Sequence, residues 1–291
     1  MTKRPMAGDD SADTEAGPTL SVPPGSPAAK LFDIPFMQAT GLQCLTCDPV
    51  RSVFRLEPQN WVRAAEPGRF DPGALTAIID QLSSSAIWGR YGPELPHATI
   101  SLNAEFLARL DLKTLRFESQ IAAEGDGLAH IALEVRCEDT DALLAKASAM
   151  FFLGSYASGA KGRDASDFAN LGPSSAQNFE NYLGVEEQGG TAILPFRPRL
   201  VGSLDPMALH GGAIAAGLIH GAHLALPKDS THTLKRVTIE YLKGAHPADT
   251  SYTGHIVNAG RSSTVVSVEG RQGETRLIAT ALARFADFSN N

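Results

Sequence analysis

An internal repeat is the feature that most constrains how this chain can fold. Two blocks of the sequence carry the same signals in the same order, and an offset held within five residues indicates a tandem duplication. Thr99-Ile100 matches Thr238-Ile239, and Gly73 matches Gly212, both at an offset of 139 residues. The pattern Ala-x-Ala-x-Ala-x-Phe occurs at 145–151 and again 134 residues later at 279–285. The chain is therefore expected to form two similar units.

Each block has one helix of small residues followed by strands in which apolar and polar residues alternate. Such alternation is typical of half-buried antiparallel strands. The expected helices cover 73–88 and 211–225, and the expected strands cover 97–107, 115–125, 127–138, 142–152, 236–245, 251–260, 263–271 and 275–288. An antiparallel sheet covered by a helix is an α+β unit, and two such units could join their sheets and protect two edges.

Composition divides the chain into four segments. Residues 1–30 and 155–178 are rich in Gly, Pro, Ser and Ala, which predicts a disordered leader and a linker. The two repeats are then expected to occupy 31–154 and 179–291.

The net charge of −7 and the pI of about 5.6 argue against a nucleic-acid or membrane-surface protein, because both classes favour basic patches. The sequence shows no signal peptide and no run of 18 apolar residues, so a cytoplasmic location is expected. Cys44 and Cys47 have no second ligand pair near them, which favours two strand residues over a zinc or redox site. No metal is predicted.

Two stretches stand out in the helices, "LHGGAIAAGLIHGAH" at 209–223 and "FDPGALTAIIDQLSS" at 70–84. The helix start His210-Gly211-Gly212 and the strands after it resemble the hotdog fold, and specifically the phenylacetyl-CoA-type acyl-CoA thioesterases in a tandem double-hotdog arrangement. The resemblance covers roughly 33–153 and 179–288. In single-domain members a carboxylate follows the His by nine residues on the same helix; Asp80 takes this place in the first block and Ile219 in the second.

The resemblance implies hydrolysis of an acyl-CoA thioester, with CoA as part of the substrate and no other cofactor. This chemistry needs a donor for the carbonyl oxygen and a base or nucleophile near the carbonyl carbon. A free N–H at a helix start, at Gly211 or Gly212, can be the donor, and Asp80 can supply the carboxylate. In the family motif the glycine and the carboxylate lie on one helix, about 12 Å apart at about 1.5 Å per residue, so one carbonyl group cannot contact both. The site is therefore expected to combine Asp80 of repeat 1 with His210–Gly212 of repeat 2, on antiparallel helices.

The second composite site that such a pair of helices would form is expected to be inactive. It would join Ile219, which has no acid–base chemistry, to Pro72, which has no N–H to donate. Asp71 is interpreted as a helix N-cap before Pro72, whereas Asp80 lies among the apolar residues Ile78, Ile79 and Leu82, where a lone carboxylate is costly unless it is used or paired.

Other residues are assigned smaller roles. His210 is expected to orient substrate, close the helix start or act in acid–base catalysis, and Ser84, one turn after Asp80, could hold the nucleophilic water. His220 and His223 are interpreted as packing or surface residues. The turn containing Arg261 and Ser262, with Arg236, is expected to bind the CoA phosphates.

The hotdog fold also occurs in dehydratases and enoyl-CoA hydratases, so fold alone does not decide the reaction. In the dehydratases the acid follows the glycine by five residues, whereas Asp80 follows Gly73 by seven. A non-catalytic acyl-CoA-binding module is the other alternative. The acyl group, the carrier (CoA or acyl-carrier protein) and the role of Asp80 as base or nucleophile stay open, and a homo-oligomer of the pseudo-dimeric chain is possible.

Overall fold

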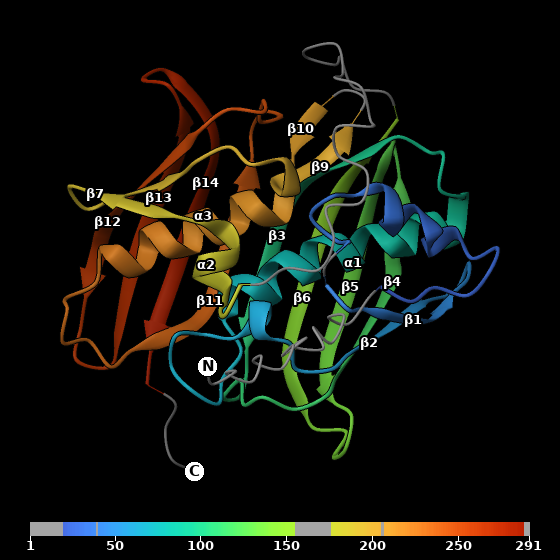
Figure 1. Cartoon of the computed structure of the whole chain (residues 1–291), viewed down its shortest axis with the longest axis horizontal. Coiled ribbons are helices and arrows are strands. Elements are labelled where there is room, and N and C mark those ends of the chain that lie inside the picture. The colour runs from blue at the N-terminus through green and yellow to red at the C-terminus, as the bar shows by residue number, and fades with distance from the viewer. Residues whose placement is uncertain (1–19, 39, 155–175, 205–206, 288–291) are drawn as a thin grey trace, which may run out of the picture.

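The computed structural model describes residues 20–38, 40–154, 176–204 and 207–287, in which one large antiparallel sheet carries helices on one face (Figure 1). The sheet has 12 strands in the order β1-β2-β4-β5-β6-β3-β11-β14-β13-β12-β8-β7. Six strands from the first half of the chain are thus followed by six from the second, and the halves meet where β3 pairs with β11. The α+β class expected from the sequence is confirmed.

The strands and helices have the following bounds. The sheet strands are β1 (Gln43–Cys47), β2 (Ser52–Leu56), β3 (His97–Phe106), β4 (Leu115–Gly125), β5 (Leu128–Cys137), β6 (Leu143–Leu153), β7 (Glu186–Gln188), β8 (Thr191–Leu194), β11 (Thr233–Tyr241), β12 (Thr250–Ala259), β13 (Ser263–Gln272) and β14 (Arg276–Ala286). A separate two-stranded sheet joins β9 (Val201–Leu204) to β10 (Met207–Leu209). The helices are α1 (Pro72–Tyr91), α2 (Phe179–Leu183) and α3 (Gly211–Leu224), with the 3-10 helices η1 (Pro27–Asp33), η2 (Asn60–Val62) and η4 (Pro198–Leu200).

Helix α1 begins and ends at residues suited to those positions. The Asp71 side chain caps it by accepting a hydrogen bond from the Ala74 N–H at 3.0 Å, and Pro72 occupies the first turn, where no N–H is needed. At the other end Gly92 takes φ 89°, a conformation that L side chains rarely adopt. The capping role expected for Asp71 is confirmed.

Helices α1 and α3 lie side by side and run antiparallel. A Cβ added at Gly212 would lie 2.7 Å from the Ala77 Cα, and a Cβ added at Gly73 would lie 3.6 Å from the Ala216 Cα. Contact of the start of each helix with a later part of the other requires opposite directions. Glycine at 212 allows the two backbones to approach this closely.

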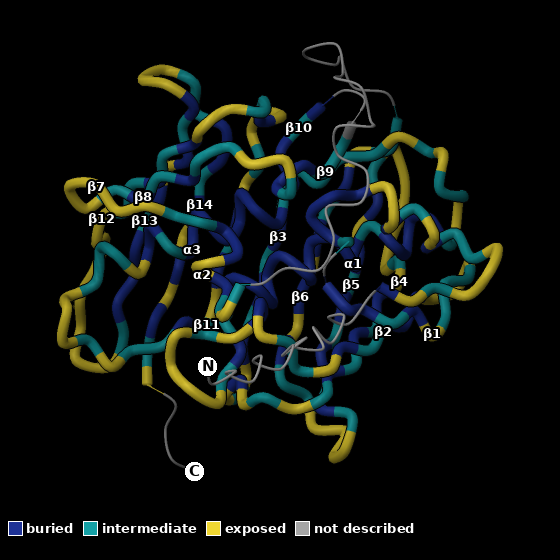
Figure 2. Tube along the Cα trace, in the orientation of Figure 1, coloured by how far each residue is buried: buried dark blue, intermediate teal, exposed yellow. Residues whose placement is uncertain are grey.

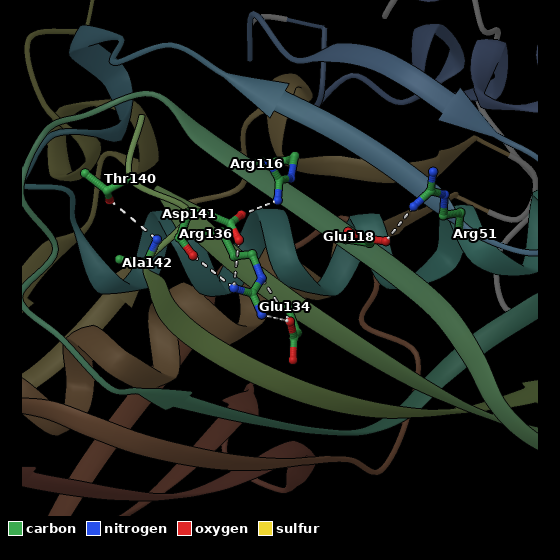
Figure 3. A network of polar contacts seen from close by, with 8 residues as sticks. All are labelled: Arg51, Arg116, Glu118, Glu134, Arg136, Thr140, Asp141 and Ala142. Atoms are coloured by element: carbon green, nitrogen blue, oxygen red, sulfur yellow. Dashed lines mark hydrogen bonds and ion pairs between the residues drawn. The ribbon is translucent and has the colours of Figure 1, made fainter. Parts of the chain in front are cut away.

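The two faces of the sheet differ in character. The core lies between the sheet and helices α1 and α3, where buried segments gather (Figure 2). On strands β4 and β5 of the outer face, Arg116 pairs with Asp141 and Arg136 with Glu134, while α1 passes behind the sheet (Figure 3). Chemistry that involves the helix starts is therefore confined to the inner face.

Several segments differ from the sequence expectations. The predicted leader is wrong for residues 20–30, because Leu20 and Ala28 are buried in the core and Ser21 bridges to Gln43; residues 1–19 lie outside the described part. The predicted linker lies outside it over 155–175. Cys44 and Cys47 lie in β1, as expected, with free thiols. Among the described residues, no helix has the length and apolar character needed to cross a bilayer.

Candidate active site

The structure brings Asp80 of α1 against the first residue of α3. A Cβ added at Gly211 would lie only 2.6 Å from Asp80 Oδ2, so a carboxylate oxygen occupies the space beside the Gly211 backbone. Asp80 itself is buried, with 4% of its surface exposed. Two groups that the sequence places 131 positions apart therefore meet at one point.

The surroundings of Asp80 favour its neutral form. Burial raises its pKa to about 7, although the hydroxyls of Thr99 and Tyr241 and the Gly212 amide lie close enough to favour the charged form. None of these groups forms a well-aligned hydrogen bond to Oδ1, which has no partner within the described chain. A buried carboxylate with a free acceptor atom and a pKa near neutrality is typical of a functional acid or base.

His210 closes the start of α3. Its Nδ1 accepts a hydrogen bond from the Gly212 N–H at 2.8 Å, its Nε2 lies 2.6 Å from Gln81 Oε1, and its ring stacks on Phe36 at 4.4 Å. Burial lowers the pKa of His210 to about 3, so the ring is neutral at physiological pH. Of the roles considered for His210, the structure favours the helix-closing one over acid–base catalysis.

This arrangement determines which amide is free at the helix start. The Gly212 N–H is engaged by His210, and the Ala213 and Ile214 N–H groups donate to the His210 carbonyl at 3.0 and 3.1 Å. The Gly211 N–H, at the positive end of the helix dipole, has no hydrogen-bond partner among the described residues and is available to donate to an external oxygen.

Thr99, Tyr241 and Gln81 are site residues that the sequence analysis did not assign. Thr99 lies on β3, where the pairing with β6 shifts register between Thr99 and Ser101. Because a bulge interrupts the alternation of side chains, the pattern could not show which face Thr99 occupies. Tyr241 ends β11, and its hydroxyl donates to the Gly211 carbonyl at 3.2 Å.

The remaining predicted residues lie at varied positions. Ser84 is half-buried on α1, one turn after Asp80. Arg261 and Ser262 are exposed in the turn between β12 and β13. Arg236 is exposed and contacts Asn103 Oδ1 at 2.9 Å and Glu105 at 3.7 Å. Its neighbour Val237 is buried in the core, so alternation places Arg236 on the outer face of the sheet, away from Asp80.

A cavity of about 370 Å³ lies at the start of α1, where the second composite site was expected. Asp71, Pro72 and Gly73 line it from one repeat, and Ile219 and His223 line it from the other. The cavity has neither a carboxylate at Ile219 nor an N–H at Pro72. Burial raises the pKa of Asp71 to about 6, but its side chain is engaged in capping α1.

The two later histidines of α3 are held by neighbouring groups. The His223 ring packs edge-on against Phe285, with Nδ1 2.9 Å from the Ile219 carbonyl, and burial lowers its pKa. His220 lies 3.8 Å from Glu180 and 3.6 Å from Glu187. These contacts agree with the packing roles expected for them.

Comparisons with known proteins agree with this fold. The tesB protein of Mycobacterium avium subs paratuberculosis superposes with a TM-score of 0.57 and 14% identity, covering 89% of this chain and 97% of that one. An acyl-ACP thioesterase from Bacteroides thetaiotaomicron gives a TM-score of 0.53 and 10% identity, covering 81% and 97%. No curated protein matches the chain.

A family model matches the second half of the sequence. Residues 201–286, which include His210, Gly211 and Tyr241, match the model of the acyl-CoA thioesterase N-terminal domain. The resemblance to acyl-CoA thioesterases is thereby confirmed for this segment, which matches a domain of enzymes that hydrolyse thioester bonds. Residues 201–286 form an acyl-CoA thioesterase domain.

Proposed function

We propose that the chain hydrolyses acyl-CoA thioesters at one composite site, formed by Asp80 of the first repeat and the α3 start of the second. The observation that supports this most is the position of the buried Asp80 carboxylate, with its Oδ2 beside Gly211 and its Oδ1 unpartnered in the described chain. In this arrangement Asp80 would act as the base and the Gly211 N–H as the oxyanion donor for one carbonyl group.

In the proposed reaction the Asp80 carboxylate removes a proton from water while the water oxygen attacks the thioester carbon. The carbonyl oxygen gains the negative charge and accepts a hydrogen bond from the Gly211 N–H. The C–S bond then breaks as the carbonyl re-forms, and the proton held by Asp80 passes to the leaving sulfur, which gives a carboxylic acid and free CoA. Ser84 is proposed to orient the water. Direct attack by Asp80 would instead give a mixed anhydride, which hydroxylamine would trap.

The pH dependence follows from the environment of Asp80. The proposed base must be charged, and burial raises its pKa to about 7. We expect kcat/KM to rise with pH up to a plateau above about 8, with the acid limb centred near 7 rather than near 4. A pH profile with a non-ionising acyl-CoA substrate measures this limb. A profile flat between pH 5 and 8 would contradict the role of Asp80.

The substrate is proposed to be a small-molecule CoA thioester, whose phosphates Arg261 and Ser262 would bind. Arg236 lies on the outer face of the sheet, so it could bind a CoA phosphate only if the CoA chain crossed the edge of the sheet. One structural neighbour is named an acyl-ACP thioesterase, so the choice between CoA and acyl-carrier protein as the carrier of the acyl group needs its own test. We expect release of thiol from an acyl-CoA chain-length panel, with the same acyl groups on acyl-carrier protein hydrolysed more slowly. Faster turnover of the protein-bound acyl groups would reverse the carrier assignment.

Two rival functions make different predictions. A dehydratase or enoyl-CoA hydratase would interconvert hydroxyacyl and enoyl thioesters without releasing thiol. A non-catalytic acyl-CoA-binding module would bind the ligand and release no thiol, and its affinity would survive the change Asp80→Asn. Thiol release that depends on Asp80 distinguishes the hydrolase from both.

The wider organisation is proposed on the same grounds. The mirrored strand order about the β3–β11 pairing supports a tandem double hotdog, with one unit up to residue 154 and the other from 179. The free thiols of Cys44, Cys47 and Cys137 support a reducing, cytoplasmic setting. Neither a nucleic acid nor a membrane is proposed as a partner. Measurement of the mass in solution tests whether copies of this chain form a homo-oligomer.

A further inference from the structure

Tyr241 links the two parts of the candidate site. It is the last residue of β11, in the second repeat, and its hydroxyl lies 3.2 Å from the Gly211 carbonyl oxygen. The same hydroxyl lies beside the Asp80 carboxylate of the first repeat. The Gly211 backbone therefore has Asp80 Oδ2 and the Tyr241 hydroxyl as neighbours, one from each repeat.

The phenol is a hydrogen-bond donor throughout the working pH range. Burial and the nearby Asp80 raise the pKa of Tyr241 well above 10, so it keeps its proton. A single O–H faces two acceptors, the Gly211 carbonyl and Asp80. While Asp80 is neutral the O–H can serve the carbonyl, and once Asp80 is charged the carboxylate is the stronger acceptor.

Building on the proposed thioesterase function, we propose that Tyr241 is a positioning residue, whose O–H fixes the Gly211–Gly212 peptide while Asp80 is neutral and stabilises the carboxylate of Asp80 once it is charged. The first effect matters because two successive glycines have the greatest backbone freedom. The stabilisation of Asp80 matters because the reaction requires its carboxylate to be charged although it is buried.

Few other groups could produce these effects. Against Asp80, β3 contributes the Thr99 hydroxyl and α3 the Gly212 amide, neither of which titrates. His210 is neutral and faces Gln81. Tyr252 of β12 lies near Tyr241 and stays protonated, because burial raises its pKa. Tyr241 is thus the titratable residue, among those described, that acts directly on Asp80.

The test is Tyr241→Phe, which removes the hydroxyl and keeps the ring. We expect kcat to fall roughly 10-fold on the pH plateau, KM to stay within about twofold, and the acid limb of kcat/KM to move up by about 0.5–1 pH unit, because the charged carboxylate has lost a donor. The matched control is Tyr252→Phe. Its hydroxyl lies near Thr250 but forms no well-aligned hydrogen bond within the described residues, and its ring packs against Gly217 and Gly221 of α3. The acid limb should not move in this control.

A second measurement does not depend on turnover. Infrared difference spectra across pH, with Asp80→Asn as the blank, give the pKa of the Asp80 carboxyl in the wild-type and Tyr241→Phe proteins. An unchanged carboxyl pKa together with an unchanged kcat would overturn the role of Tyr241. A wild-type protein that releases no thiol, yet shows the carboxyl shift in Tyr241→Phe, would refute the thioesterase and leave the link between Tyr241 and Asp80 intact.

Discussion

Replacing Asp80 by Asn is expected to lower kcat for acyl-CoA hydrolysis by about 100-fold or more, the range for loss of a general base. The amide has nearly the same shape as the carboxylate but cannot take a proton from water. KM should change little, since the lost interaction acts on the reacting water rather than on the bound thioester. Steady-state assays with a thiol reagent measure the effect.

Unfolding cannot explain this loss, because the variant is expected to be the more stable protein at alkaline pH. The pKa of Asp80 rises from an ordinary 3.8 to about 7 on folding, so the folded state binds the proton more tightly. Stability is therefore lost as pH rises from about 4 to 7, and a neutral Asn avoids that loss. We expect Asp80→Asn to melt above the wild type at pH 8 and level with it below pH 4.

Asp71→Asn is the matched control for Asp80→Asn. Asp71 is another carboxylate of the same helix region with a raised pKa, but its role is to cap α1 through the Ala74 N–H. Asn caps helices as well as Asp does. Turnover within twofold of wild type is expected for Asp71→Asn. Equal losses in the two variants would place the active site elsewhere.

The main elements could be predicted from local signals and the repeat, and the meeting of Asp80 with the α3 start could be predicted from the family resemblance combined with the distance along one helix. Alternation identified the strands, and the distance along one helix required the two groups to come from separate helices. Helix α2 and the β9–β10 pair were missed, since elements of three to five residues leave too short a pattern to detect.

The partners around Asp80 could not be predicted for a different reason. The contact between His210 and Gln81 joins residues 129 positions apart, and the repeat offset pairs neither with the other. Thr99 and Tyr241 lie on strands, where alternation gives a face but not the depth at which a hydroxyl lies. Near Thr99 the pairing shifts register, so alternation does not predict even the face of the sheet on which Thr99 lies. Such contacts depend on how the two repeats dock, which no single-segment pattern records.

Alanine at the two glycines of the α3 start is expected to cause two different failures. In Gly211→Ala the new methyl group would lie 2.6 Å from Asp80 Oδ2, so the carboxylate must turn away from the oxyanion donor. We expect kcat/KM to fall by about 10–100-fold. The melting temperature should hold or rise, since Ala favours a helix over Gly by up to about 1 kcal/mol.

Gly212→Ala should instead lower stability. Its methyl group would lie 2.7 Å from both the Cα and the carbonyl oxygen of Ala77, which are backbone atoms that cannot turn aside, so α1 and α3 must separate. A loss of about 1–3 kcal/mol in the free energy of unfolding is expected, measured by urea denaturation. Gly125→Ala, which meets no atom within 4 Å, is the neutral control. The methyl group of Gly211→Ala must displace the Asp80 carboxylate from the start of α3, and this should weaken catalysis if the thioester binds at that helix start. Full activity in a normally folded Gly211→Ala variant would therefore show that the α3 start does not bind the thioester oxygen.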